Sequence, residues 1–360
     1  MNKKKRTTIS DIARELNVTA STVSRALKNH PRISDSTKEA VWKMVEKLNY
    51  QPNNIAAALR KGKSNIIGVI VPTSDRHFFA SVIRGIEEVI REEGYNLIIC
   101  QSDDQFLKEQ LNIDALLQIQ VDGIIASIAK ETTDISHFEK IKNRGVPLVL
   151  YDRVSESLDA NAVVTDDYLG AYKAVTHLIE QGCKRIAHFS GRQHINIYKD
   201  RLKGYRDALK EHNLEVDEDL IIESDLIRDT DRILKTGNKL GNQLLQLPQT
   251  PDGVFSSSDF AAMGAIQTFK EQGISIPDEI ALVGYSNDFS CSVIEPGLTS
   301  LDQHTKRMGN FAAQLFLDQV NSNEDDFTPR KTLLNPQLIV RASSSRIKKP
   351  DSSYASEAVT

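Results

Sequence analysis

Apolar and polar residues alternate with a helical period at the start of the chain. Thr8 and Asp11 have the spacing of a capping box, in which each side chain satisfies a backbone N–H at the start of a helix. This pattern predicts a first helix that ends near Leu16. Asn17 tolerates the left-handed backbone of a tight turn, so the chain is expected to reverse there.

Two more helices are expected after this turn. Thr19 can cap a helix over 20–28, and Ser34 can cap another over 34–48. The short turn between the first two gives helix-turn-helix spacing. The apolar positions predict one small core: Ile12, Ala13, Leu16, Val18, Val23, Ala26, Ile33, Val41, Trp42, Val45 and Leu48. A generic three-helix domain would show the same positions, so they leave the function open.

From residue 64 the pattern changes to short apolar runs that alternate with amphipathic helices. Strands are expected at 66–71, 96–100, 122–126, 148–151, 185–189, 253–256 and 280–284. Helices are expected at 78–93, 105–118, 135–144, 168–181, 201–212, 232–247 and 260–272, with Gly94, Gly145, Gly182 and Gly273 as stops. This alternation predicts doubly wound parallel sheets covered on both faces. The segment is too long for one sheet, so two lobes are expected, the second beginning near 164–166.

The charge balance separates the two parts. Residues 1–63 hold fourteen Lys and Arg against five Asp and Glu, whereas the rest of the chain holds 31 against 44. A basic head on an acidic body indicates a polyanion partner for the head alone. Together with an exposed Ser-Thr-Val-Ser-Arg stretch at 21–25, the charge favours DNA. Arg25 can donate two hydrogen bonds to one guanine, and Ala20 and Ser21 would adjust the choice of base.

The sequence lacks the residue patterns of disulfide frameworks, metal sites and membrane spans. The cysteines, Cys100, Cys183 and Cys291, are odd in number and far apart, so no disulfide framework, metal or cofactor is expected. No apolar run is long enough to span a membrane and no secretory segment opens the chain, which predicts a cytoplasmic, nucleoid-associated protein.

Catalytic motifs also fail. The segment 284–288 begins like a nucleophile elbow but has Asp288 in place of the second glycine, and 57–64 has Ala57 where a phosphate loop needs glycine. An enzyme is therefore not expected. The alternative is a pure solute-binding protein, against which the basic head and the missing signal segment argue.

Three segments carry a specific resemblance: Thr-Ile-Ser-Asp-Ile-Ala at 8–13, Val-Thr-x-Ser-Thr-Val-Ser-Arg-Ala-Leu at 18–27 and Leu-Asn-Tyr-x-Pro-Asn at 48–53. In order and spacing they resemble the head and hinge of the LacI/GalR family of transcription regulators. The resemblance implies a homodimer that binds a palindromic double-stranded operator, with positions 20, 21 and 25 reading bases. It further implies backbone contacts from Thr8, Thr19, Thr22, Ser24, Lys28, Ser34, Thr37, Tyr50 and Asn53.

Residues 52–60 would form the hinge helix of such a regulator. Ala56, Leu59 and Arg60 would then enter the minor groove, with Leu59 as an apolar wedge at the centre of the site. The helix is too short to be stable in isolation, so it should fold only against a partner. An ordinary linker leucine is the alternative interpretation of Leu59.

The resemblance continues through the body, at 67–72, 122–125, 201–205, 255–264 and 283–285. It implies a fold similar to periplasmic sugar-binding proteins, with a chain that crosses between lobes more than once. The expected first lobe is 64–165 with about 300–325, and the second is 166–299 with about 326–346. Residues 51–63 would be the linker and 347–360 a disordered tail.

Ligands of open α/β sheets bind beyond the carboxyl ends of the strands, here the cleft between lobes. A sugar-like effector is expected there, and the resemblance places these residues around it: Phe78, Phe79, Asp152, Arg153, Arg201 at the start of its helix, Asp259, Ser286 and Asn287. The two phenylalanines could equally be core, and Asp152 and Arg153 a surface ion pair. Ser286 and Leu226 depart from the residues often seen in the family, which leaves the ligand class open.

Overall fold

The computed structural model describes residues 7–50, 63–224, 230–322 and 327–346, and for 230–233 it describes the backbone alone. The chain forms two compact units, 1–64 and 65–360, and each is described by itself. The predicted hinge residues, including Asn53, Ala56, Leu59 and Arg60, lie outside the described ranges, as do Leu226 and the tail at 347–360.

The first unit consists of three helices: α1 (Ile9–Glu15), α2 (Ala20–Leu27) and α3 (Asp35–Lys47). The capping box of Thr8 and Asp11 is present, and the Thr19 and Ser34 hydroxyls each accept a hydrogen bond from the first turn of the following helix. Asn17 has a φ of 51°, so it makes the left-handed turn between α1 and α2. The three predicted helix starts and the turn are thereby confirmed.

The core of this unit contains the predicted apolar residues with one exception. Ile12, Val23 and Val41 are fully buried, whereas Trp42 is 51% exposed. Trp42 follows Val41 on α3 and therefore points about 100° away from the buried face. Tyr50 fills the core after α3 and is only 7% exposed.

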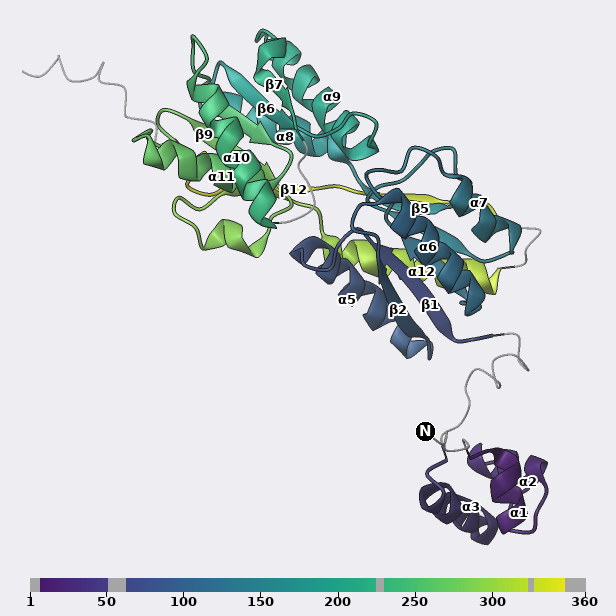
Figure 1. The fold of residues 1–360 in the computed structure, drawn as a ribbon. Helices are drawn as coiled ribbons and strands as arrows, with labels where there is room; N and C mark the ends of the chain where they lie inside the picture. The colour runs from purple at the N-terminus through teal and green to yellow at the C-terminus, as the bar shows by residue number, and fades with distance from the viewer. Residues whose placement is uncertain (1–6, 51–62, 225–229, 323–326, 347–360) are drawn as a thin grey trace, which may run out of the picture. The chain divides into compact units, whose positions relative to one another are not determined.

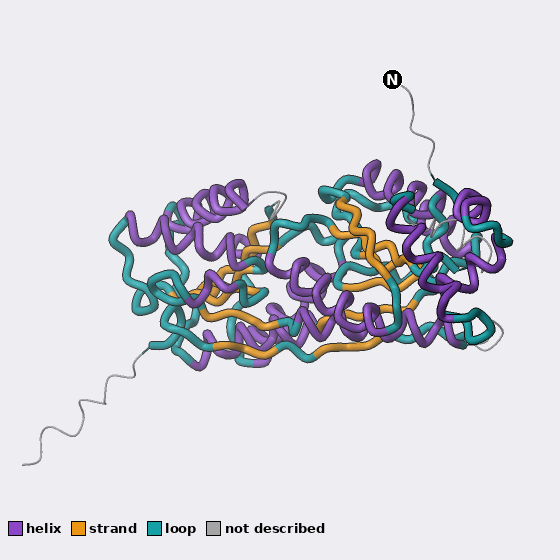
Figure 2. Tube along the Cα trace, turned by 90° about the horizontal axis from the view of Figure 1, so that it is seen from below, coloured by secondary structure: helices purple, strands orange, loops and turns teal. Residues whose placement is uncertain are grey.

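The second unit has two six-stranded sheets, with orders β11-β5-β4-β3-β1-β2 and β12-β10-β9-β8-β6-β7 (Figure 1). Helices cover the strands in both halves (Figure 2). Among the described residues, every strand pairing is parallel except that of β10 with β12. The sheets define a first lobe and a second lobe, as the alternating pattern predicts.

The first lobe is built from these elements in chain order: β1 (Ile66–Val71), α5 (His77–Glu92), β2 (Asn96–Gln101), α6 (Phe106–Gln118), β3 (Gly123–Ala126), α7 (Ser136–Asn143), β4 (Leu148–Tyr151), β5 (Asn161–Thr165), α12 (Thr305–Asn321) and β11 (Lys331–Leu334). The second lobe contains the others: α8 (Asp167–Glu180), β6 (Ile186–Ser190), α9 (Asn196–Glu211), η1 (Glu218–Leu220), β7 (Ile221–Glu223), α10 (Thr230–Leu245), β8 (Gly253–Ser256), α11 (Asp259–Glu271), β9 (Ala281–Tyr285), η2 (Phe289–Ser292), β10 (Thr299–Asp302) and β12 (Gln337–Ile339).

Glycine ends four helices, as predicted. Gly94, Gly145, Gly182 and Gly273 all have positive φ, and each follows a helix of the larger unit. A residue with a side chain would be strained in this conformation, so glycine allows each helix to stop and the chain to turn toward its next strand.

The chain passes between the lobes three times: between β5 and α8, between β10 and α12, and between β11 and β12. The predicted lobe boundaries therefore need correction. Residues 299–302 pair in the second sheet, and residues 331–334 pair in the first. Both β11 and β12 are short edge strands with exposed residues, so they lack the continuous apolar run that marks a central strand.

Helix α12 completes the first lobe by packing closely against α5 (Figure 1). A Cβ added to Gly309 would lie 2.1 Å from the Val82 carbonyl oxygen, and one added to Gly85 would lie 2.2 Å from the Lys306 carbonyl oxygen. The two glycines thus let the helix backbones approach closely. This packing anchors α12 to the first lobe after the chain has left the second.

Candidate functional site

The exposed face of α2 is the first candidate site. Ala20, Ser21 and Arg25 are exposed, whereas Val23 and Ala26 are buried in the core. The predicted base-reading side chains therefore share one solvent-exposed side of a helix, which is the arrangement that major-groove recognition requires.

The predicted backbone-contacting residues fall into three groups. Thr8, Thr19 and Ser34 are the N-caps of the three helices, where free N–H groups and the helix dipole favour an anion such as phosphate. Thr22, Ser24, Lys28 and Thr37 are exposed or half-exposed. Tyr50 is the exception, because its side chain is buried in the core of the head.

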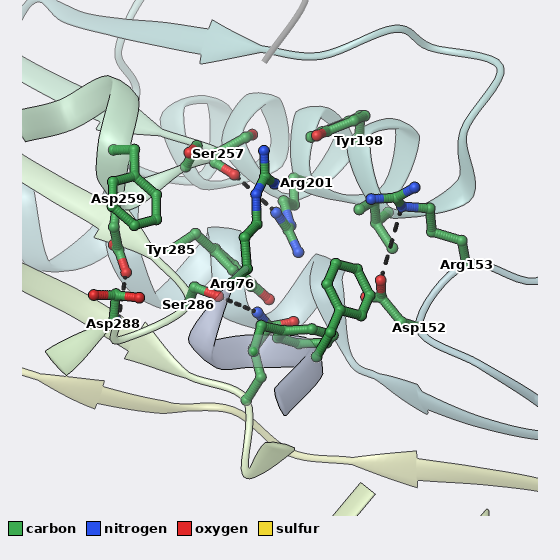
Figure 3. Close-up of a pocket in the computed structure, with 16 residues that line it drawn as sticks. Arg76, Asp152, Arg153, Tyr198, Arg201, Ser257, Asp259, Tyr285, Ser286 and Asp288 are labelled. Atoms are coloured by element: carbon green, nitrogen blue, oxygen red, sulfur yellow. Dashed lines mark hydrogen bonds and ion pairs between the residues drawn. The ribbon is translucent and has the colours of Figure 1, made fainter. Parts of the chain in front are cut away.

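The second candidate site is a cavity between the two lobes, with a volume of about 600 Å³ when its open mouth is included. Its lining comes from the first turns of α5, α9 and α11 and from the carboxyl ends of β4, β8 and β9. Seven of the eight predicted effector residues line it: Phe78, Phe79, Asp152, Arg153, Arg201, Asp259 and Ser286 (Figure 3).

Asn287, the eighth predicted residue, does not line the cavity. Its side chain donates a hydrogen bond to Asp302 (3.1 Å) and accepts one from Arg341 (2.8 Å). These contacts hold the loop after β9 against β10 and the C-terminal segment. The prediction is corrected for this residue, because its left-handed backbone turns the side chain toward those partners.

Arg201 lies at the floor of the cavity and is fully enclosed. Its Nε donates to Asp167 (2.7 Å), one of its Nη atoms donates to the Ser257 carbonyl oxygen (3.0 Å), and its guanidinium lies 3.6 Å from the centre of the Tyr285 ring. The helix begins at Asn196 rather than at Arg201, so Arg201 is in its second turn. The guanidinium links α8, α9, β8 and β9 at one point.

Burial changes the protonation of this ion pair. It raises the pKa of Asp167 to about 6, because the desolvation of the carboxylate outweighs the attraction of Arg201. The paired carboxylate in turn raises the pKa of Arg201, which stays positively charged.

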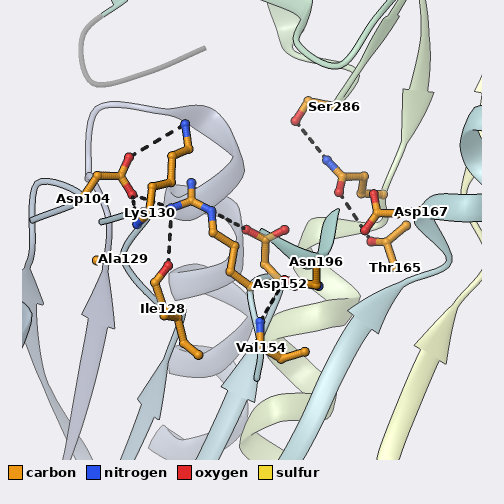
Figure 4. Close-up of polar contacts among 12 residues, drawn as sticks. Asp104, Ile128, Ala129, Lys130, Asp152, Val154, Thr165, Asp167, Asn196 and Ser286 are labelled. Carbon is orange, nitrogen blue, oxygen red and sulfur yellow. Dashed lines mark hydrogen bonds and ion pairs between the residues drawn. The ribbon is translucent and has the colours of Figure 1, made fainter. Parts of the chain in front are cut away.

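Asp152 and Arg153 are buried in the cavity wall, so the alternative of a surface ion pair is wrong. Arg153 donates to Asp104 and lies 3.8 Å from Asp152, and Asp104 is also 4.0 Å from the Lys130 ammonium (Figure 4). These cations lower the pKa of Asp104 despite its burial. The wall therefore holds a cluster of buried charges rather than an apolar surface.

Asp259 positions the loop after β9. Its two carboxylate oxygens accept hydrogen bonds from the Ser300 hydroxyl (2.6 Å) and the Asp288 backbone N–H (2.9 Å). Ser286 and Asn287 have positive φ values in this loop, and such backbone needs support from its surroundings. Asp259 supplies that support from the first turn of α11.

Further polar residues around the cavity were not predicted as ligand-binding from the sequence. They include Arg76, Tyr198, Ser257, Ser258, Asp288 and Gln303. Gln303 lies on the second crossing between lobes, where it donates to the Ser286 hydroxyl (3.1 Å) and its carbonyl oxygen is 3.5 Å from the Thr165 hydroxyl of the first crossing (Figure 4). Their position at the carboxyl ends of strands is the only pattern that could have pointed to them.

Comparison with known proteins identifies the family of the chain. The chain matches the model of bacterial regulatory proteins of the lacI family at residues 8–53 and that of a periplasmic binding protein-like domain at residues 175–344. It is 30% identical over 342 residues to the transcriptional repressor PurR of Actinobacillus pleuropneumoniae serotype 3 (strain JL03), covering 95% of this chain and 99% of the relative. The chain belongs to the LacI family. It is a DNA-binding regulator of transcription.

Two solved structures of this family are similar to the chain as a whole. A complex of the transcriptional regulator CelR with cellobiose has a TM-score of 0.69 and 26% identity, covering 94% of this chain and 100% of the other. The Lac repressor dimer bound to operator has a TM-score of 0.80 and 22% identity, covering 94% and 99%. The second comparison supports the fold of this LacI-family chain.

Within the described ranges, no helix is long and apolar enough to cross a membrane, and no group of three His, Cys, Asp or Glu side chains is placed to hold a metal ion.

The raised pKa of Asp167 predicts a pH dependence of stability. Because the folded state takes up a proton between pH 3.8 and about 6, this carboxyl group stabilises the fold less as pH rises through that window. Asp167→Asn should remove this pH dependence, whose full span from below pH 3.8 to above pH 6 is about 3 kcal/mol in the free energy of unfolding, with the larger part falling between pH 4.5 and 7. Denaturant unfolding at pH 4.5 and 7 would measure it, with Asp219→Asn on the exposed surface as the control. A difference between wild type and Asp167→Asn that does not change with pH would contradict the assignment.

Proposed function

We propose that this regulator is a homodimeric repressor that reads a palindromic operator through α2 and whose operator affinity is set by a sugar-like effector in the interlobe cavity. The observation that carries the proposal is the combination, in one chain, of an exposed basic recognition helix and a buried polar cavity centred on Arg201. Its role is binding rather than catalysis, and it acts on the nucleoid in the cytoplasm.

DNA recognition is assigned to the exposed face of α2. Arg25 can donate a pair of hydrogen bonds to guanine O6 and N7, whereas Ala20 and Ser21 offer a small apolar contact and a hydroxyl. The capped N-termini at Thr8, Thr19 and Ser34 are suited to the DNA phosphates. Residues 52–60 remain assigned to the minor groove, with Leu59 as the wedge.

Effector recognition is assigned to the cavity. Arg201 is held in one orientation by Asp167 and Ser257, so it presents a fixed donor to ligand oxygens. Phe78 and Phe79 provide apolar surface for a sugar ring. The CelR regulator was solved with cellobiose, which supports a carbohydrate-type ligand for this chain.

Coupling between the sites is assigned to the lobe crossings. A ligand that touches both lobes favours the lobe geometry in which all its contacts are made. The crossing residues Thr165 and Gln303 are joined to Ser286 at the cavity, so a change in lobe geometry acts at the point where the chain passes between lobes. The two hinge segments of the dimer would then move apart or together, which changes their packing in the minor groove.

The first prediction of this proposal concerns the oligomer. One recognition helix reads a half-site, so a palindrome requires two copies related by a two-fold axis. Sedimentation at micromolar concentration, with and without operator DNA, should show a dimer. A monomer under both conditions would contradict the proposal.

The second concerns base recognition. Arg25→Ala should weaken binding to the specific site by about 1–3 kcal/mol and relax base preference at one symmetric position. Arg14→Ala removes the same charge from the exposed side of α1 and should weaken binding by a smaller, sequence-independent amount. Selection from a random palindromic library, followed by titration at constant salt, measures both. An unchanged base preference in Arg25→Ala would refute its role.

The same assay can include the minor-groove residue. Leu59→Ala should reduce both affinity and DNA bend angle, because the central base step is no longer opened by the wedge. If both stay at the wild-type value, residues 52–60 act only as a tether.

The third prediction concerns the effector. Arg201→Ala and Phe78→Ala should leave operator affinity near the wild-type value and abolish its change on addition of a ligand found by screening carbohydrates. Arg206→Ala, on the same helix as Arg201 but paired with Glu218 on the outer face, should respond normally. Phe78→Ala is included because Arg201→Ala leaves the buried Asp167 without its partner. A full response in both cavity variants would place the effector elsewhere.

A further inference from the structure

One charged side chain in the cavity is unmatched. Arg76, the N-cap residue of α5, lines the cavity, and its side chain makes no hydrogen bond or ion pair with any residue in the described ranges. Its Nη2 atom is shielded from solvent and has no partner. By contrast, Arg201 is paired with Asp167, and Arg153 with Asp104.

The surroundings of Arg76 do not compensate for its charge. Burial and the nearby Arg153 lower the pKa of Arg76, although Asp104 and Asp75 oppose them. Asp104 already accepts from Arg153 and lies near Lys130, and Asp75 accepts from the Thr73 hydroxyl. Arg76 is half-buried, and a charge withdrawn from water without a partner is costly, so an anion bound beside it would remove that cost.

Backbone dipoles at the cavity add to the positive charge of Arg76. The first turns of α5, α9 and α11 all line the cavity, and none of their N-cap residues, Arg76, Ile195 and Ser258, makes a side-chain capping hydrogen bond. Helix N-termini carry a partial positive charge and free N–H donors, which favour anions. Asp259, at the start of α11, offsets one of the three.

One side of the cavity carries hydrogen-bond acceptors. Asp259 and Asp288 lie there, across from Asp152 and Arg153, with Arg76, Arg201 and Tyr285 between them (Figure 3). Their carboxylates accept from the Ser300 and Ser290 hydroxyls (2.6 and 2.7 Å), and carboxylate oxygens have capacity for further donors. This side therefore suits ligand hydroxyl groups.

We propose that the cavity takes a polyhydroxylated ligand that carries an oxyanion, a phosphate or a carboxylate, and that Arg76 binds this group. The proposal rests on the effector role of the cavity and narrows the chemistry of the effector. A neutral sugar offers the guanidinium hydroxyl acceptors but no opposite charge, so Arg76 favours an anionic ligand over a neutral one.

The first test needs no ligand. Arg76→Gln removes the unmatched charge and keeps much of the side-chain volume, so the midpoint of thermal unfolding of the full chain should rise by a few degrees. Arg84→Gln is the control, because Arg84 lies on the same helix, is 74% exposed and pairs with Glu88. It should leave the midpoint unchanged. A midpoint that falls in Arg76→Gln alone would show that Arg76 stabilises the fold, and would overturn the proposal.

The second test uses inorganic phosphate as the probe, against chloride at equal ionic strength. Phosphate should raise the unfolding midpoint of wild type and Arg84→Gln, and the affinity deduced from this shift should fall at least tenfold in Arg76→Gln. Any phosphate bound by the basic head is the same in all three proteins, so the difference reports the cavity. Equal protection of wild type and Arg76→Gln would overturn the proposal.

Measuring the unfolding midpoint with glucose, glucose 6-phosphate and glucuronate then distinguishes a phosphate ester from a carboxylate as the anionic group of the ligand. Protection by the phosphate ester or by the uronate, lost in Arg76→Gln, identifies which group is accepted. If glucose raises the unfolding midpoint of the wild-type protein as much as glucose 6-phosphate and glucuronate do, an anionic effector is refuted. That result would leave the proposed function standing, because the operator assay with Arg201→Ala and Phe78→Ala tests it independently.

Discussion

The interlobe cavity is organised around one buried contact, the ion pair of Arg201 with Asp167. Arg201 comes from α9, Asp167 begins α8 just after the chain enters the second lobe, and the guanidinium also holds the Ser257 carbonyl at the end of β8 and stacks on Tyr285 at the end of β9. Four elements distant in sequence thus meet at one planar cation. A side chain able to donate in several fixed directions and to stack on a ring is required there, which lysine cannot replace.

The same geometry explains why the cavity is polar. In parallel sheets, the carboxyl ends of strands and the N-termini of helices face the same edge, and here the edges of two sheets face each other. Loops at this edge cannot satisfy all their backbone groups with each other, so buried side chains such as Asp259 take part. A residue such as Asp259 therefore both makes structural hydrogen bonds and lines the cavity.

Sequence reasoning predicted what local chemistry determines. The capping box at Thr8, the turn at Asn17 and the glycine stops such as Gly94 depend on neighbours within a few residues, and the structure contains all of them. Edge strands β11 and β12 were not predicted, because their pairing comes from strands more than thirty residues away and one side stays exposed. Trp42 was misplaced because the helical period allows a residue beside the buried stripe to point either way. Arg76 was not predicted, because no pattern in the neighbouring sequence shows that its side chain lacks a hydrogen-bond partner in the folded chain.

The three lobe crossings lie beside the cavity and contact one another. Asp166 donates its backbone N–H to the Leu334 carbonyl (2.8 Å), which joins the first crossing to the third, and Gln303 of the second crossing lies against Thr165 and Ser286. The crossings are thus bonded to one another beside the ligand site. A relative motion of the lobes must change these few contacts, whereas the sheets and α12 can move as intact bodies. A ligand bound in the cavity could therefore favour one lobe geometry while leaving both hydrophobic cores unaltered, because Gln303 both lines the cavity and lies on a crossing.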